Sequence, residues 1–237
     1  MIRIEQLRYR WPGNDQDTLS IERLAVESGE RFFLRGPSGC GKSTLLSLLG
    51  GIITPDSGTI TVNDQVVSEL NASERDRWRS DNLGLIFQQF NLLPFLSITE
   101  NVLLPCRFSK QRRQRATAGG KSLGEEAHRL LQSLDLDPAD FSGTTGNVGN
   151  LSVGQQQRVG AARALIGAPP LILADEPTAA LDTQTRDRFI ALLLNEAHTA
   201  GSTVFVVSHD LGMVPSFDRD MDLVSLLGNS PVTAIDN

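Results

Sequence analysis

The stretch GPSGCGKST at residues 36–44 decides the fold class of this chain. It follows the apolar run RFFLR, leads into LLSLLGG, and fits the pattern G-x-x-x-x-G-K-[ST] between an expected strand and an expected helix. Glycines allow successive backbone N–H groups to turn inward around phosphates, and the N-terminal end of the helix adds positive potential. A nucleotide is therefore predicted to bind through residues Gly36, Pro37, Ser38, Gly39, Cys40, Gly41, Lys42, Ser43 and Thr44.

Nucleotide chemistry at this loop needs cations and a positioned water. Lys42 supplies a point charge, and the hydroxyl of Ser43 is a predicted ligand of Mg²⁺. The apolar run LILAD ends in Asp175, and Glu176 follows it. Because adjacent strand residues point to opposite sides, we expect Asp175 to hold a water of the Mg²⁺ shell and Glu176 to face the attacking water. Capping of the following loop is the alternative role for this acidic pair.

Apolar periodicity predicts the α/β class. Uninterrupted apolar runs, typical of strands buried on both faces of a mostly parallel sheet, lie at 31–35, 83–87, 170–175 and 203–209. The last of these runs ends at His209, where ligands collect in open α/β sheets, although a structural histidine is the alternative. The alternating start MIRIEQLRYRW and an expected hairpin at 58–67, around Asn63-Asp64, predict an antiparallel β part near the N-terminus.

Residues 89–165 lack strand character and are predicted to be a helical insertion. Within them SLGEEAHRLLQSLDLD is expected to form a helix closed by Asp137-Pro138, with one apolar face of Leu123, Ala127, Leu130, Leu131 and Leu134. The basic run SKQRRQRATAGGKS (109–122) is predicted to be a solvated loop between helices. Contact with anionic lipid or a partner is the alternative.

Composition limits the partners of the chain. Its formal charge of −6 and pI of about 5.1 argue against a nucleic-acid binder. The two cysteines, Cys40 and Cys106, are too few for a secreted disulfide scaffold, so a reducing cytosol is expected. No run of about 18 apolar residues is present, and we expect any membrane role to come through a partner protein.

The stretch LSVGQQQRVGAARAL (151–165) separates this chain from other phosphate-loop proteins. Ser152-x-x-Gln155 predicts a capping box and a second helix start able to bind an anion. One nucleotide site already has the lysine loop, so a second such helix start makes sense if two chains pair head to tail and each completes the other's site. A plain helix start without a ligand is the alternative.

Taken together, these motifs resemble the ATP-binding subunit of ATP-binding cassette (ABC) transporters, over essentially the whole chain. The chain is similar to that family in its Walker A loop GPSGCGKST, its Walker B strand LILADE, and LSVGQ for the signature LSGGQ. Gln88 resembles the Q-loop glutamine, Asp182 the D-loop residue and His209 the switch histidine.

The resemblance implies a RecA-like core at 1–88 and 166–237, with a helical subdomain at 89–165, in one nucleotide-binding domain of 1–237. It implies that ATP is hydrolysed with Mg²⁺ in a homodimer, sandwiched between the Walker A loop and the partner's signature. The implied catalytic residues are Glu176, His209 and Gln88, and the implied metal site is Ser43, Gln88 and Asp175. The implied nucleotide contacts outside the loop are Trp11 (or Tyr9 instead), Ser152, Gly154, Gln155 and Asp182.

Two positions depart from the family pattern. Val153 replaces the first glycine of the signature, which removes some backbone freedom, and Ala180 stands where the D-loop often has serine. Gly154 and Ser152 are kept. We expect both changes to adjust turnover without abolishing it.

Within the family, LGLIFQQFNLLPFLSITENVLLP (83–105) most resembles the ATPases of lipoprotein release, macrolide export and cell division. This subgroup implies a separate integral-membrane permease, attachment at the cytoplasmic face of the inner membrane, and export or mechanical work on a lipoprotein, drug or peptide. The short segment after MDLVSLLGN also favours export over import. A complex that regulates envelope enzymes without transport, and an importer, remain alternatives. The apolar residues after Gln88 fit either a docking groove for a permease helix or the core of the subdomain.

Overall fold

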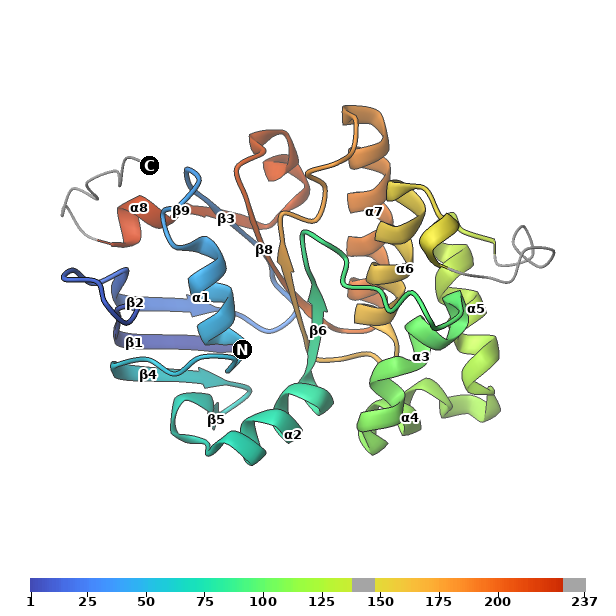
Figure 1. Ribbon diagram of the computed structural model, residues 1–237, viewed down its shortest axis with the longest axis horizontal. Coiled ribbons are helices and arrows are strands. Elements are labelled where there is room, and N and C mark those ends of the chain that lie inside the picture. The colour runs from blue at the N-terminus through green and yellow to red at the C-terminus, as the bar shows by residue number, and fades with distance from the viewer. Residues whose placement is uncertain (138–147, 228–237) are drawn as a thin grey trace.

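The computed structural model describes residues 1–137 and 148–227, which form two β-sheets with helices around them (Figure 1). The strands are β1 (Ile2–Tyr9), β2 (Leu19–Val26), β3 (Arg31–Arg35), β4 (Ser57–Val62), β5 (Gln65–Val66), β6 (Leu83–Ile86), β7 (Leu171–Asp175), β8 (Thr203–Ser208) and β9 (Arg219–Asp222). The α-helices are α1 (Lys42–Leu49), α2 (Ala72–Asn82), α3 (Ile98–Phe108), α4 (Lys110–Ala116), α5 (Leu123–Ser133), α6 (Val153–Leu165), α7 (Thr183–Thr199) and α8 (Leu223–Leu226). The 3-10 helices are η1 (Val67–Glu69), η2 (Ala118–Gly120), η4 (Val148–Asn150) and η5 (Leu211–Ser216).

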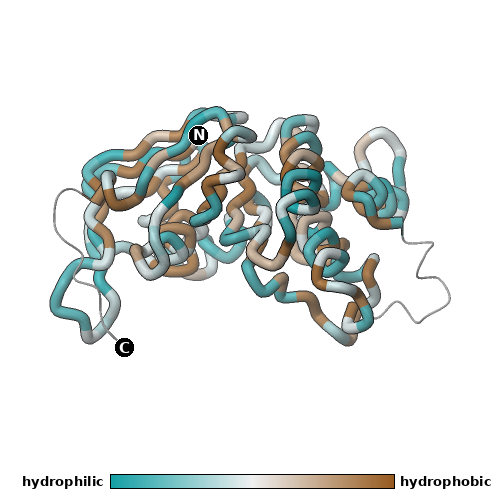
Figure 2. Tube along the Cα trace, turned by 90° about the horizontal axis from the view of Figure 1, so that it is seen from above, coloured by the Kyte–Doolittle hydropathy of each residue, from teal (hydrophilic) through white to brown (hydrophobic). Residues whose placement is uncertain are grey.

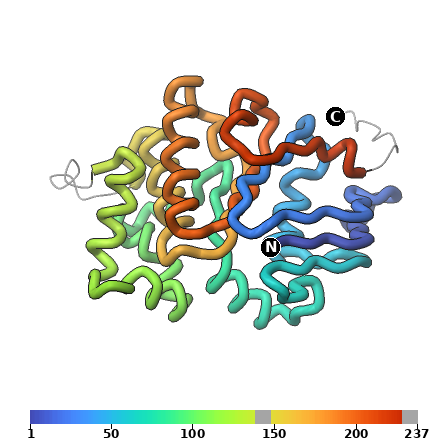
Figure 3. Tube along the Cα trace, turned by 180° about the vertical axis from the view of Figure 1, so that it is seen from behind, coloured from blue at the N-terminus to red at the C-terminus, as the bar shows by residue number. Residues whose placement is uncertain are grey.

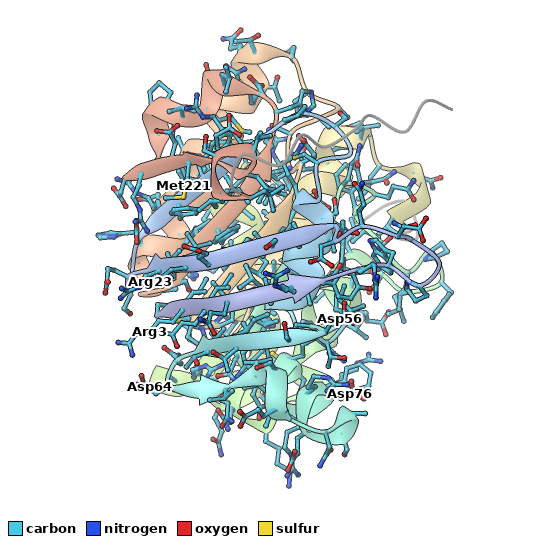
Figure 4. All side chains as sticks on the ribbon, turned by 90° about the vertical axis from the view of Figure 1, so that its left-hand side faces the viewer. Arg3, Arg23, Asp56, Asp64, Asp76 and Met221 are labelled. Carbon is cyan, nitrogen blue, oxygen red and sulfur yellow. The ribbon has the colours of Figure 1, made fainter. Side chains whose placement is uncertain are left out.

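The antiparallel sheet has the strand order β2-β1-β4-β5. Its residues alternate between the core and solvent along β1, except at the register shift where Glu5 and Gln6 are both exposed, because successive side chains of a strand point to opposite faces. In Figure 4 the exposed side chains of Arg3 on β1 and Arg23 on β2 lie at the same end of this sheet. Between β4 and β5 the hairpin turn is Asn63-Asp64, and both residues have positive φ angles, 48° and 61°. This is the backbone that a two-residue turn of type I′ needs, so the predicted hairpin is confirmed.

The parallel sheet has the order β6-β7-β8-β3-β9, and every pair of neighbouring strands in it is parallel. Its strands confirm the apolar runs predicted at 31–35, 83–87, 170–175 and 203–209. Phe32 packs into the core shared with the antiparallel sheet, and Phe33 packs into the core shared with the helices. The sheet is therefore covered on both faces, which is why its strands are apolar without alternation.

Helix α1 lies between the two sheets, and its leucines pack in the same core as Ile2 and Ile4. In the view from above, apolar segments gather where the sheets and helices face each other (Figure 2). Seen from behind, the red C-terminal segment crosses from β8 over β3 toward the antiparallel sheet, where α8 contacts β2 (Figure 3). The edge strand β9 pairs with β3 and was not predicted from the sequence, because RDMD has no apolar period.

Helices α3, α4, α5 and α6 confirm that residues 89–165 carry helices instead of strands over the part that the structure describes. Helix α5 covers most of the helix predicted from SLGEEAHRLLQSLDLD, and Leu134 is its C-cap residue. Its predicted closure at Pro138 lies outside the described residues, as do residues 228–237 at the C-terminal end. Among the described residues no helix is long and apolar enough to cross a membrane.

The sequence prediction for the basic run 109–122 is wrong in part. Residues 110–116 of this run form α4, and Arg112 on this helix is 2% exposed, whereas residues 118–122 are exposed as predicted. The Arg112 guanidinium donates to the carbonyl oxygens of Leu83 (2.8 Å), Ala164 (2.7 Å) and Ile166 (2.8 Å). The carbonyls at the C-terminal end of α6 lack helical partners, and a cation stabilises that end of a helix. Arg112 is therefore a cap for α6, and a solvated loop would leave these acceptors unpaired.

Candidate active site

The phosphate loop joins β3 to α1 and has the backbone that its glycines predict. Gly39 and Gly41 have positive φ angles of 79° and 102°, and Gly41 is the N-cap residue of α1. At Gly36 a β-carbon would lie 2.7 Å from the sulfur of Cys40, so a side chain does not fit there. No side chain caps the N-terminus of α1. Its first backbone N–H groups are therefore available to an anion, which is the arrangement that a phosphate needs.

The side chain of Lys42 folds back onto the phosphate loop. Its ammonium group donates to the carbonyl oxygens of Gly36 (2.7 Å) and Pro37 (3.0 Å), and its side chain is 7% exposed. The same nitrogen lies 3.9 Å from Oε1 of Glu176. The positive charge thus lies beside the loop, between its backbone carbonyls and Glu176, the residue that follows the Walker B strand.

Asp175 and Ser43, two of the three predicted metal ligands, lie close together at the carboxyl end of the parallel sheet. Asp175 ends β7, and burial raises its pKa, with a smaller rise from the charge of Glu176. A hydrogen bond with Ser43 and the charge of Lys42 lower the pKa of this carboxyl and oppose the rise. A partly buried carboxylate beside a hydroxyl and an ammonium group is a setting in which a divalent cation would further favour the ionised form.

Glu176 is held by the end of β8. Its Oε2 accepts the hydroxyl of Ser208 (2.6 Å), and its Oε1 accepts the backbone N–H of His209 (3.1 Å) and lies 2.8 Å from Nδ1 of the same histidine. The backbone of Glu176 has a positive φ of 44°, and its N–H donates to Val207 (2.9 Å). The sequence prediction relied on strand alternation to separate Asp175 from Glu176. The left-handed backbone turns the carboxylate toward β8 instead, and such a conformation in a non-glycine residue costs energy and is frequent at functional sites.

An aromatic pair lies beside the loop. The indole N–H of Trp11 donates to the hydroxyl of Thr44 on α1 at 3.3 Å. Tyr9 packs edge-on against Trp11, with 5.2 Å between ring centroids and 86° between ring planes. Tyr9 is buried, and burial raises its pKa, whereas Trp11 is 42% exposed. Of the two aromatic residues considered from the sequence, Trp11 is the one with a ring surface open to a ligand.

The remaining predicted site residues are not joined to this cluster. These remaining residues are Gln88, Ser152, Gly154, Gln155 and Asp182. Among the described residues, the structure records no hydrogen bond or ion pair from any of these five to Lys42, Asp175 or Glu176. Gln88 is exposed in the turn after β6. Ser152 and Gln155 form the predicted capping box at the start of α6, which is confirmed with N–H···O distances of 2.8 and 3.3 Å.

Asp182 caps α7 by accepting the backbone N–H (3.0 Å) and the hydroxyl (2.7 Å) of Thr185. These hydrogen bonds lower the pKa of Asp182. The backbone at Val153 is helical and the side chain is 48% exposed. The freedom of the glycine that Val153 replaces is therefore not used in this conformation, because no positive φ is required at that position.

Two contacts in and beside the candidate site were missed from the sequence. Ser208 holds Glu176, and only its place beside His209 at a strand end would have indicated it. Arg163 on α6 donates to the carbonyl oxygens of Asn91 (2.7 Å) and Phe90 in the segment that follows Gln88. Arg163 is one of two arginines in α6, with Arg158, and no sequence signal separates it from a solvated side chain.

A phosphate loop whose lysine faces an aspartate and a glutamate at the end of another strand of the same parallel sheet defines a P-loop nucleotide hydrolase. The chain belongs to the ABC transporter family, whose model matches residues 19–179. It is an ATP-hydrolysing cassette of that family.

Relatives of known sequence support the same assignment. The chain is 39% identical over 196 residues to the uncharacterized ABC transporter ATP-binding protein MJ0796 of Methanocaldococcus jannaschii, covering 83% of this chain and 80% of that protein. It is 36% identical to the lipoprotein-releasing system ATP-binding protein LolD of Syntrophotalea carbinolica, covering 86% and 85%. It is 37% identical to the macrolide export ATP-binding/permease protein MacB of Burkholderia pseudomallei, covering 89% of this chain but 31% of that protein.

A solved structure has the same fold. The dimeric structure of a post-hydrolysis state of the MJ0796 cassette, bound to ADP and Pi, matches with a TM-score of 0.78 and 33% identity over 94% of both chains. The similarity to an ATP-binding cassette of this kind confirms the α/β fold with a mostly parallel sheet, an antiparallel β part and helices, as predicted from the sequence.

Proposed function

We propose that this chain is the ATPase subunit of a transport complex, in which it powers a separate integral-membrane permease for export or mechanical work on an extracytoplasmic lipoprotein, drug or peptide. The observation that carries the proposal is the cluster in which Lys42 and His209 both contact Glu176 beside an uncapped phosphate loop. The similarity to LolD and MacB supports this subgroup. Association with the cytoplasmic face of the inner membrane is part of the same proposal.

The residues present fit ATP together with Mg²⁺. Ser43 and Asp175 are neighbours at the end of the loop, so they would hold the metal directly and through a water, with Gln88 as a further ligand. Mg²⁺ would neutralise charge on the β- and γ-phosphates. The loop N–H groups and Lys42 would bind those phosphates, and Trp11 would stack on the adenine.

The attack on the γ-phosphate needs a positioned water. Glu176 would orient this water and accept its proton, and His209, whose ring reaches Glu176 and is exposed, would contact the γ-phosphate. Lys42 would leave the carbonyl oxygens of Gly36 and Pro37 for the phosphate oxygens, since a charge-assisted bond to an anion is stronger than a bond to a neutral carbonyl.

A homodimer would complete the site. The start of α6 is exposed at Ser152, Val153 and the neighbouring turn, and a partner's γ-phosphate would meet the hydroxyl of Ser152 with the N–H groups of Gly154 and Gln155. Asp182, at the exposed start of α7, would lie at the same interface. The dimer reported for the MJ0796 cassette supports this arrangement.

We also propose a division into a RecA-like core at 1–88 and 166–237 and a helical subdomain at 89–165, with the permease docking between them. The sequence left two alternatives for the apolar residues after Gln88, a docking groove or the core of the subdomain, and the structure contains residues of both kinds. Leu92 and Leu103 pack against the core, and Phe95 is 78% exposed. An exposed phenylalanine of this kind supports a protein contact at the loop between β6 and α3.

Affinity purification of the Glu176→Gln variant from its native membranes in mild detergent with ATP and Mg²⁺ tests this proposal. The variant should bind ATP, hydrolyse it slowly, and retain the closed dimer, because the carboxamide cannot act as a base. A co-purified permease with few spans and a large extracytoplasmic domain would support export or mechanical work. A many-span permease with a soluble binding protein would contradict it, and the Lys42→Ala variant is the control for ATP-dependent recovery.

A further inference from the structure

Arg186 lies in the first turn of α7 and joins this helix to the loop of the switch histidine. Its Nη1 forms an ion pair of 2.7 Å with Asp210, the residue after His209. Its Nη2 and Nε contact Asp187 at 2.7 and 2.8 Å. The side chain of Arg186 is 12% exposed although both of its acidic partners lie nearer the surface. A guanidinium held on two sides by carboxylates has a fixed orientation.

The packing around this ion pair is close. A β-carbon at Gly212, the second residue of η5, would lie 2.5 Å from Nη1 of Arg186. Asp210 also caps η5, because its Oδ1 accepts the N–H of Gly212 at 2.9 Å. The guanidinium therefore lies against the backbone at the start of η5, and a glycine there leaves the space for it.

From Asp210 a chain of hydrogen bonds reaches the catalytic carboxylate. The backbone N–H of Asp210 donates to the hydroxyl oxygen of Ser208 at 3.1 Å, and that hydroxyl donates to Oε2 of Glu176 at 2.6 Å. His209, between them, contributes both its backbone N–H and its ring to Oε1 of Glu176. A movement of Asp210 would therefore displace the groups that hold Glu176.

Arg186 is also part of the first turn of α7, of which Asp182 is the N-cap residue. The backbone N–H of Arg186 donates to the carbonyl oxygen of Asp182 at 2.8 Å, and the Asp182 carboxylate caps the same turn. Thr178, earlier in the segment that leads to Asp182, contacts the sulfur of Met213 in η5 at 3.2 Å. The D-loop and the switch-histidine loop are thus joined by this ion pair and by one buried contact.

We propose that Arg186 is a positioning residue for ATP hydrolysis, because its ion pair with Asp210 holds Ser208 and His209 where they orient Glu176. The inference rests on the proposed function, in which Asp182 lies at the dimer interface. Contacts made there by the partner chain would then reach Glu176 of this chain through Arg186 and Asp210. The pair is fully charged at neutral pH, since the hydrogen bond with Arg186 lowers the pKa of Asp210 and the reverse contact raises the pKa of Arg186.

The test compares Arg186→Gln with Arg188→Gln in the full chain. Arg188 is two residues further along α7, is exposed, and pairs with Asp135 away from the phosphate loop, so it is a matched control. We expect Arg186→Gln to lower kcat for ATP about tenfold, because a small displacement of a catalytic group has effects of this order, and to leave KM within about twofold. Arg188→Gln should leave both constants at the wild-type values.

Two further variants separate positioning from simple packing. Asp210→Asn should reproduce the loss in kcat, and the double variant should be no slower than either single variant, since residues on one path are not additive. Arg186→Lys, which keeps the charge, should recover part of kcat. Additive losses, or a kcat for Arg186→Gln within about twofold of that for Arg188→Gln, would overturn the inference. Failure of the wild-type chain to hydrolyse ATP with Mg²⁺ would instead overturn the proposed function, and with it this inference.

Discussion

Replacement of Arg112 by alanine tests the role of the basic helix α4 in stability. The Arg112 guanidinium is buried, and its three shortest sets of hydrogen bonds, at 2.8 Å or less, go to the carbonyl oxygens of Leu83, Ala164 and Ile166, with a longer one of 3.3 Å to that of Arg163. The ion pairs recorded among residues 1–137 and 148–227 do not include it. Its contribution to the free energy of unfolding therefore comes from these carbonyls and from the dipole of α6, set against the cost of burying an uncompensated charge.

The magnitude follows from these two opposing terms. At about 2 kcal/mol for each of three carbonyls left without a donor, the variant loses about 6 kcal/mol. Burial lowers the pKa of Arg112 from its ordinary value to about 10. A shift of that order corresponds to about 3 kcal/mol, which the variant regains. The expected net loss is about 3 kcal/mol, or a fall in Tm of about 6–12 °C for a chain of this size.

Thermal and urea unfolding of Arg112→Ala measure this loss, with Arg113→Ala as the matched control. Arg113 is exposed on the same helix, and its replacement should change the free energy of unfolding by no more than about 0.5 kcal/mol. Arg112→Lys should be almost as unstable as Arg112→Ala, since one ammonium group cannot span three separated acceptors. If Arg112→Ala unfolds within about 1 kcal/mol of Arg113→Ala, the capping of α6 by Arg112 is refuted.

Two further outcomes follow from the site. Val153→Gly should keep ATPase activity within about tenfold, which corresponds to about 1.4 kcal/mol in the activation barrier. The reason is that the backbone at Val153 is helical and does not need the conformational freedom of glycine. Complete loss of turnover would contradict this. Trp11→Ala should weaken ATP binding about tenfold through lost stacking, as measured by calorimetry. Tyr9→Leu, which removes the ring, should leave the affinity within about twofold because the ring of Tyr9 is buried; the opposite order would place the adenine on Tyr9.

Motifs that depend on local geometry could be predicted from the sequence. The phosphate loop, the hairpin turn at Asn63-Asp64 and the capping box of Ser152 and Gln155 each involve residues within a few positions of one another. The buried strands were predicted because strands covered on both faces are apolar throughout. These features also carried the family resemblance, and so most of the fold and the nucleotide site followed from them.

The sequence by itself thus determined the class of fold, the phosphate loop and the acidic pair at the end of an apolar strand, because each depends on local pattern. Only the tertiary structure decided which polar side chains work together. In KQRRQRA the buried Arg112 and the exposed Arg113 are adjacent, and only carbonyls 29 to 54 residues away distinguish them. Ser208 reaches Glu176 from 32 residues away, and Arg186 reaches Asp210 from 24. The physical reason is that hydrogen bonds and ion pairs depend on distance in space, and a polar residue in a sequence carries no period that identifies its partner.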